Sequence, residues 1–131
     1  MNFWTRILKH IPDHAPDGDA EIGKRGERIA RQFLEHRGLR VIERNWASRF
    51  GEVDLICRDG DTHVFVEVKA SRRLGAVSPD CRVDSEKQRR LRRLAQHYLK
   101  QRAVEEPVRF DVIAVWWEDN VPRINHIENA F

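Results

Sequence analysis

Two neighbouring segments within residues 51–70, GEVDLICR and THVFVEVKA, constrain the fold of this chain more than any other stretch. Both are rich in β-branched and aromatic residues, which is typical of strands. Between them, Asp59 and Gly60 form a dipeptide that favours a two-residue hairpin turn. We therefore expect the two segments to pair as an antiparallel hairpin.

Side chains alternate along a strand, so this hairpin has one charged face and one apolar face. The predicted turn sets Asp54 opposite Phe65 and Glu52 opposite Glu67, with Lys69 on the same face. Asp54 and Glu67 are then diagonal neighbours with backbones roughly 7–8 Å apart, near enough for both carboxylates to reach one ion. The apolar face carries five residues: Val53, Leu55, Val64, Val66 and Val68.

The rest of the chain predicts two helices and three further strands. Apolar residues recur at helical spacing over residues 19–36, which end before Gly38, and again up to about residue 102 after a capping Asp84 or Ser85. Three further strands are predicted, over residues 39–45, 108–118 and 122–131. The order α-β-β-β-α-β-β predicts an α/β domain in which helices cover the faces of a mixed central sheet.

The length of 131 residues, 40% of them hydrophobic, suits one domain with one core. Residues 1–18 contain a stretch rich in Pro, Asp and Gly and are predicted to be a flexible N-terminal segment, so the domain spans residues 19–131. No apolar run approaches the roughly 18 residues of a membrane span, and no secretory cleavage site is present. We expect a cytoplasmic protein in which Cys57 and Cys81 are free thiols, with a disulfide between them as the alternative.

The acids on the hairpin need compensation, because unpaired carboxylates in a covered sheet are destabilising. A hard divalent cation such as Mg²⁺ would provide it, with Asp54 and Glu67 as ligands. Lys69 would then orient a water molecule or stabilise charge growing on a phosphoryl oxygen. The alternative is a solvated face on which Glu67 and Lys69 form a simple charge pair.

The first helix adds a further acid, Glu27, at the margin of its apolar stripe, from where the side chain can lean towards the sheet. Taken alone, a glutamate at such a position is more often a surface residue. Gly23 and Gly26 in the same helix each cost about 1 kcal/mol relative to alanine. Close packing against a neighbouring element would explain both glycines.

Taken in order, these motifs resemble a known family. GEVD, followed after twelve residues by EVK, is similar to the signature of the PD-(D/E)xK phosphodiesterase superfamily, which shares a restriction-endonuclease-like core. The wider frame over residues 23–115, which adds GE..A..FL, I.RN and RFDVI, resembles the YraN family of predicted endonucleases. That family is related in fold to archaeal Holliday junction resolvases, some relatives of which pair as dimers, so a homodimer is an open outcome.

This resemblance implies a nuclease that uses Mg²⁺ or Mn²⁺ to hydrolyse DNA, including branched or otherwise structured DNA. It implies that Asp54 and Glu67 bind the metal, that Lys69 assists the attacking water, and that Glu27 completes the acidic cluster. Val53 stands where the superfamily's name-giving proline would be. A catalytically inactive module of the same fold, which binds nucleic acid or recruits a partner, is the alternative function.

Nucleic acid is predicted to contact the loop after the hairpin and the start of the second helix. The arginine that often follows the superfamily lysine is missing, and Arg72 or Arg73 can take over its phosphate contact. Lys87 lies in line with the buried stripe of its helix, where a phosphate contact and a salt bridge are equally open. Asp111 is expected to accept hydrogen bonds at the sheet end, and the six histidines form no zinc-ligand set.

Overall fold

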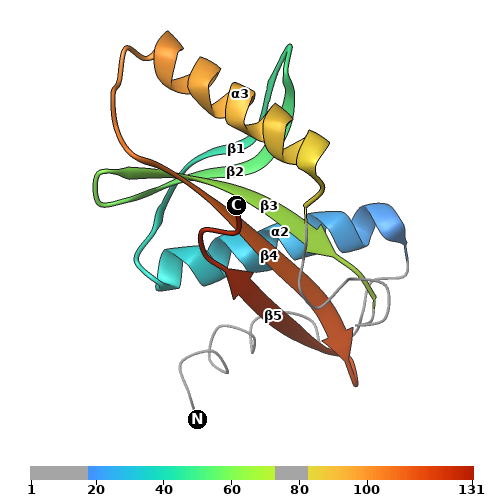
Figure 1. Cartoon of the computed structure of the whole chain (residues 1–131). Helices are drawn as coiled ribbons and strands as arrows, with labels where there is room; N and C mark the ends of the chain where they lie inside the picture. The colour runs from blue at the N-terminus through green and yellow to red at the C-terminus, as the bar shows by residue number, and fades with distance from the viewer. Residues whose placement is uncertain (1–17, 73–82) are drawn as a thin grey trace.

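Five strands form one mixed sheet at the centre of the computed structural model, which describes residues 18–72 and 83–131 (Figure 1). The elements follow one another as α2 (Asp19–His36), β1 (Arg40–Ser48), β2 (Gly51–Asp59), β3 (Thr62–Ala70), α3 (Ser85–Gln101), β4 (Val108–Glu118) and β5 (Val121–Ile127). The strands lie side by side in the order β1-β2-β3-β4-β5, with β3 and β4 parallel and all other neighbours antiparallel. The predicted α/β class and order of elements are confirmed.

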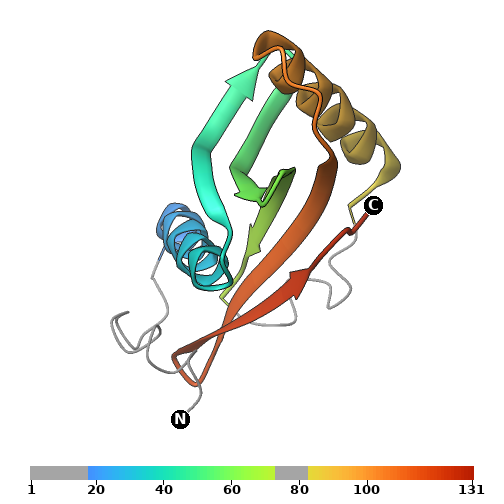
Figure 2. The same cartoon turned by 90° about the vertical axis from the view of Figure 1, so that its left-hand side faces the viewer.

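The two helices pack on opposite faces of the sheet, as the side view in Figure 2 shows. α2 buries its apolar side in a cluster that includes Val66 and Ile113. α3 packs on the other face, where the Tyr98 ring meets Phe65 edge-on with ring centroids 5.7 Å apart. Because the chain passes through α3 between β3 and β4, these two strands can run parallel at the centre of the sheet.

The β2–β3 hairpin forms, but the predicted register was wrong. Asp59 pairs with Thr62, so the turn is Gly60-Asp61 rather than the dipeptide one position earlier. Gly60 has a φ of +62°, a left-handed conformation that costs glycine little because it has no β-carbon. Each residue of β2 therefore pairs two positions further along β3 than predicted.

β1 is longer than the predicted strand over residues 39–45, because it continues to Ser48. Its pairing with β2 shifts between Val41 and Glu43, a bulge of the kind that bends a strand. Because β1 extends to Ser48, Trp46 lies inside the strand, where its ring packs edge-on against Tyr98 with centroids 5.1 Å apart. The turn into β2 is reduced to Arg49 and Phe50.

Two predictions concern segments that lie wholly or partly outside the described residues: the N-terminal segment over residues 1–18 and the loop that carries Arg73 and Cys81. Cys57 is a free, fully buried thiol, and burial raises its pKa to about 12. Within residues 18–72 and 83–131, neither helix is long and apolar enough to cross a membrane.

α2 approaches β3 closely at Gly26, one residue before Glu27. A β-carbon at Gly26 would overlap the β-carbon of Ala70, whereas a β-carbon at Gly23 would meet nothing within 4 Å. Close packing therefore explains Gly26, but the same explanation for Gly23 was wrong.

Alanine substitutions at these two glycines should have opposite effects on stability. Gly26→Ala is expected to lower the free energy of unfolding by about 1–3 kcal/mol, because the helix must move off the sheet. Gly23→Ala, the matched control, is expected to raise it by about 0.5–1 kcal/mol, because alanine favours the helix and meets no obstacle. Urea denaturation followed by circular dichroism measures both, and equal effects would contradict the close approach at Gly26.

Candidate active site

β2 separates from β3 at Asp54. Regular pairing between these strands ends with Leu55 opposite Val66. One residue before Leu55 in β2, Asp54 Oδ2 accepts a hydrogen bond from the Val68 backbone N–H at 2.7 Å. A side chain thus takes the place of the ladder bond, and β2 turns away while β3 stays paired with β4.

The separation also rotates β2 about Asp54. Leu55 belongs to the apolar cluster under α2, whereas Val53, two residues earlier, packs in the cluster under α3. In a regular strand, residues two positions apart share a face. The prediction of a single apolar face holds for Leu55, Val66 and the neighbouring valines of β3, but it was wrong for Val53.

Glu67 brings a second carboxylate to this point and meets a cation from α3. Its side chain is only 12% exposed, and its Oε1 lies 2.5 Å from Lys87 Nζ. Lys87 is in the first turn of α3, where its backbone N–H donates to the capping Asp84 Oδ1 at 2.8 Å. Of the two roles left open for Lys87, the structure shows the salt bridge.

The pKa of Asp54 is unusually high because of this environment. Burial is the largest cause, the nearby Glu67 carboxylate is the second, and the charge of Glu27 adds to both. The hydrogen bond from the Val68 N–H and the charge of Lys87 act in the opposite direction. Together they raise the pKa of Asp54 from 3.8 to about 7. Crowding of three acids thus favours a bound proton or a bound cation at this position.

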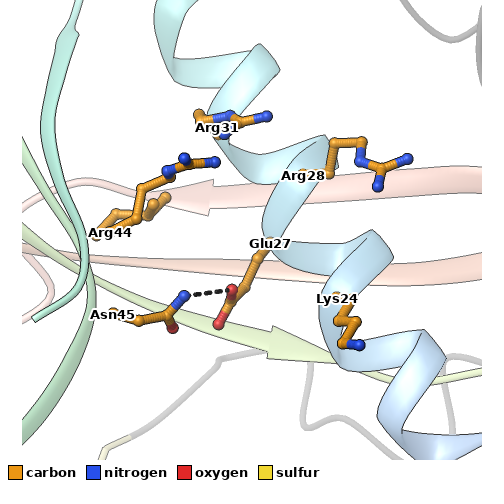
Figure 3. A pocket seen from close by; sticks show the side chains of 7 residues that line it. Lys24, Glu27, Arg28, Arg31, Arg44 and Asn45 are labelled. Carbon is orange, nitrogen blue, oxygen red and sulfur yellow. Dashed lines mark hydrogen bonds between the residues drawn. The ribbon is translucent and has the colours of Figure 1, made fainter.

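Glu27 faces the site from α2 and is held there by β1. Its Oε2 accepts a hydrogen bond from Asn45 Nδ2 at 3.3 Å (Figure 3). Asn45 has a φ of +49°, a left-handed conformation that asparagine tolerates better than most residues. The sequence patterns did not indicate Asn45 as a contact of the site acids. It joins segments that are 18 residues apart in the chain.

The predicted lysine and the first arginine follow along β3. Lys69 is half-buried and lies two residues after Glu67, so the two side chains leave the strand on the same face. Arg72 is exposed, and its carbonyl accepts the Trp117 N–H at 3.3 Å, which holds the chain beside β4 past the end of β3. Arg73, the other predicted phosphate contact, lies outside the described residues.

The donor atoms of Asp54 and Glu67 fit a hard divalent cation, which prefers carboxylate oxygens. Among the described residues, Asp54 Oδ1 and Glu67 Oε2 accept no hydrogen bond. No set of three or more His, Cys, Asp or Glu side chains in that part of the chain is arranged to hold a metal ion. A cation at Asp54 and Glu67 would therefore complete its coordination with water or substrate, as Mg²⁺ commonly does.

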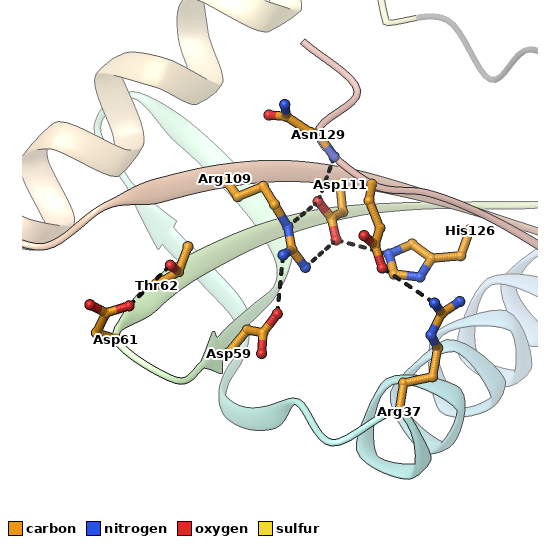
Figure 4. A network of polar contacts seen from close by, with 9 residues as sticks. Arg37, Asp59, Asp61, Thr62, Arg109, Asp111, His126 and Asn129 are labelled. Atoms are coloured by element: carbon orange, nitrogen blue, oxygen red, sulfur yellow. Dashed lines mark hydrogen bonds and ion pairs between the residues drawn. The ribbon is translucent and has the colours of Figure 1, made fainter.

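Asp111 lies apart from this site, in a buried polar network (Figure 4). Its two oxygens accept hydrogen bonds from Arg109, from the Asn129 N–H and, at 2.8 Å, from His126 Nε2. Burial pushes the pKa of Asp111 upwards, but these hydrogen bonds outweigh it and hold the pKa below its ordinary value. The side chains of Asp111 and His126 are 0% and 1% exposed. The network therefore ties the chain after β5 to β4, as expected for Asp111, and offers no access to a substrate.

Asp54→Asn should make the protein more stable at neutral pH in the absence of divalent cations. The unfolded carboxyl titrates near 3.8 and the folded one near 7, so wild type loses stability as pH rises between these values. Asparagine keeps an oxygen for the Val68 N–H and carries no charge. The variant is therefore expected to gain on the order of 2 kcal/mol over wild type at pH 8 and nothing at pH 3.

Urea denaturation of both proteins across this pH range, with a chelator present, measures the difference. Glu35→Gln, which removes an exposed carboxylate from α2, is the matched control. A difference between Asp54→Asn and wild type that does not grow with pH would contradict the crowding of acids at Asp54.

Comparison with known proteins places these residues in a family. Residues 26–115, which include all four predicted catalytic residues, match the model of the "Uncharacterised protein family UPF0102". A UPF0102 protein of Rhodococcus opacus is 45% identical over 112 residues, which cover 84% of this chain and 95% of the relative. A UPF0102 protein of Thermodesulfovibrio yellowstonii is 43% identical over 113 residues, which cover 85% and 96%. The chain therefore belongs to the UPF0102 family, which is the YraN family that its motifs resemble.

Proposed function

We propose that this protein is a metal-dependent nuclease that hydrolyses DNA phosphodiester bonds, branched or otherwise structured DNA included. The observation that carries the proposal is the meeting of Asp54 and Glu67 where β2 leaves β3, with Lys69 on the same face. Family membership agrees with it, because the motif resemblance that implied a nuclease also identified the family.

Each residue has a role that its surroundings support. Asp54 and Glu67 would hold Mg²⁺ or Mn²⁺, which would neutralise negative charge on the phosphodiester group. The Lys69 ammonium group can hold the attacking water or stabilise charge on a phosphoryl oxygen. Glu27 adds negative charge beside Asp54 and favours the cation without being required as its ligand.

The raised pKa of Asp54 supports a cation at this position. A carboxyl with a pKa of about 7 is half-protonated near neutral pH, and a cation must displace that proton to bind. Cation affinity should therefore weaken as pH falls below about 7, which is well above the range in which an ordinary aspartate would lose a metal.

The salt bridge between Lys87 and Glu67 favours a second candidate function. An ammonium group already neutralises one of the two carboxylates, as it would in a protein that never binds a metal there. Under this reading the chain is a module of the same fold that binds nucleic acid, or recruits a partner, without cutting.

Cation binding and DNA cleavage should both depend on the two carboxylates. Mn²⁺ titration calorimetry at pH 8 is expected to show binding to wild type and none to Asp54→Asn or Glu67→Gln. Cleavage with Mg²⁺ or Mn²⁺ is expected to fall by about 100-fold or more in both variants. The control Glu35→Gln should bind and cleave as wild type does.

Wild type that cleaves no single-stranded, nicked, duplex or branched DNA with either cation would contradict the nuclease. DNA binding that survives Asp54→Asn, with no metal-dependent cleavage in wild type, would establish the second candidate instead.

Lys87→Met distinguishes the two candidates independently of cleavage. Removing the ammonium group beside Glu67 is expected to tighten Mn²⁺ binding roughly five-fold, because about 1 kcal/mol of screened repulsion between the two cations is lost. Lys100→Met, an exposed lysine in the last turn of the same helix, is the control. Mn²⁺ affinity that is equal in both variants would place any cation away from Glu67.

A further inference from the structure

A pocket between α2 and β1 gathers positive charge beside the candidate active site (Figure 3). It has a volume of about 230 Å³. Four cationic side chains line it: Lys24, Arg28, Arg31 and Arg44. Glu27 is the single acid among the lining residues, so the pocket has a strong excess of positive charge.

The helix brings three of these cations to one side. Lys24, Arg28 and Arg31 follow one another at spacings of four and three residues, which place side chains on the same face of a helix. The Arg44 side chain points from β1 towards α2, as Figure 3 shows, and lines the same pocket. Like charges at these spacings repel one another, so an anion between them would be stabilising.

None of the four cations makes an ion pair within residues 18–72 and 83–131. By contrast, Arg58, Arg102 and Arg109 each pair with a carboxylate, at 2.8 to 3.1 Å. The guanidinium groups of the pocket therefore keep their donors available for an external anion. Guanidinium groups bind phosphate with two parallel hydrogen bonds, a geometry that lysine does not offer.

The size and place of the pocket indicate which anion fits. Cavities that hold whole cofactors or drug-sized ligands usually start at roughly 300 Å³ and are mostly apolar. This pocket is smaller and highly charged, which suits one phosphate group with its water. It shares Glu27 with the acidic site, and its lining residue Leu55 is the neighbour of Asp54 on β2.

We infer that this pocket is a subsite for a backbone phosphate of the nucleic acid strand next to the Glu27, Asp54 and Glu67 site. That the anion belongs to nucleic acid rests on the proposed function. The subsite would fix the path of the nucleic acid strand along α2 as that strand leaves the acidic site. It is a positioning site, and no chemistry is assigned to its arginines.

The test measures DNA binding rather than cleavage. Fluorescence anisotropy with short labelled single-stranded and duplex DNA, with a chelator and no divalent cation, compares wild type with Arg28→Gln/Arg44→Gln. Both arginines are exposed, so their replacement should leave the fold intact. The matched control is Lys100→Gln/Arg123→Gln, which removes the same charge from the end of α3 and from β5, at the opposite edge of the sheet from β1.

The pocket variant is expected to bind roughly ten-fold more weakly than the control, with a salt dependence reduced by about one phosphate contact. Arg28→Lys/Arg44→Lys should recover part of the loss, because charge returns without the guanidinium geometry. Inorganic phosphate should compete with DNA for the pocket of wild type, but only at a much higher concentration than that of the DNA.

DNA binding that is equal in the pocket and control variants, or no DNA binding by wild type, would overturn the inference. Pocket-dependent binding without metal-dependent cleavage would leave the inference standing and contradict the nuclease alone.

Discussion

The hydrogen bond from the Val68 N–H to Asp54 is the interaction on which the candidate site depends. It satisfies a backbone donor of β3 at the point where β2 leaves, so β3 can remain in the sheet without an unpaired group. The departure of β2 leaves room for Glu67 and Glu27 to approach Asp54 from β3 and α2. The Asp54 carboxylate therefore has two functions here: it takes the place of a backbone acceptor on a neighbouring strand, and its raised pKa marks the point where the acids crowd together.

Much of the fold could be predicted because its signals are local. The ends of the helices follow from the cap at Asp84 and from Gly38, which has a φ of +92°, and strands follow from β-branched runs. The hairpin register could not be predicted in the same way, because Asp-Gly and Gly-Asp are both turn-forming pairs. Which pair forms the turn depends on how β3 packs against β4 and the helices, a choice made across the whole sheet.

The candidate site shows the same division. Spacing and residue type were sufficient to single out Asp54, Glu67 and Lys69, and the family frame added Glu27. Contacts that join distant segments, such as Lys87 with Glu67, could only be left open. The basic pocket was missed altogether, because cations along a helix usually indicate a solvated face. The pocket forms only in the folded chain, where β1 lies beside α2 and brings Arg44 to the cations of that helix.

The close approach at Gly26 has a consequence for how the family can vary. Gly26 precedes Glu27 in α2, and Ala70, the residue it meets, follows Lys69 in β3. The contact between Gly26 and Ala70 thus sets how closely the backbone that carries Glu27 lies to the backbone that carries Lys69. A larger side chain at either position would move α2 away from β3, and Glu27 with it, although the sequence would still contain every residue of the candidate site.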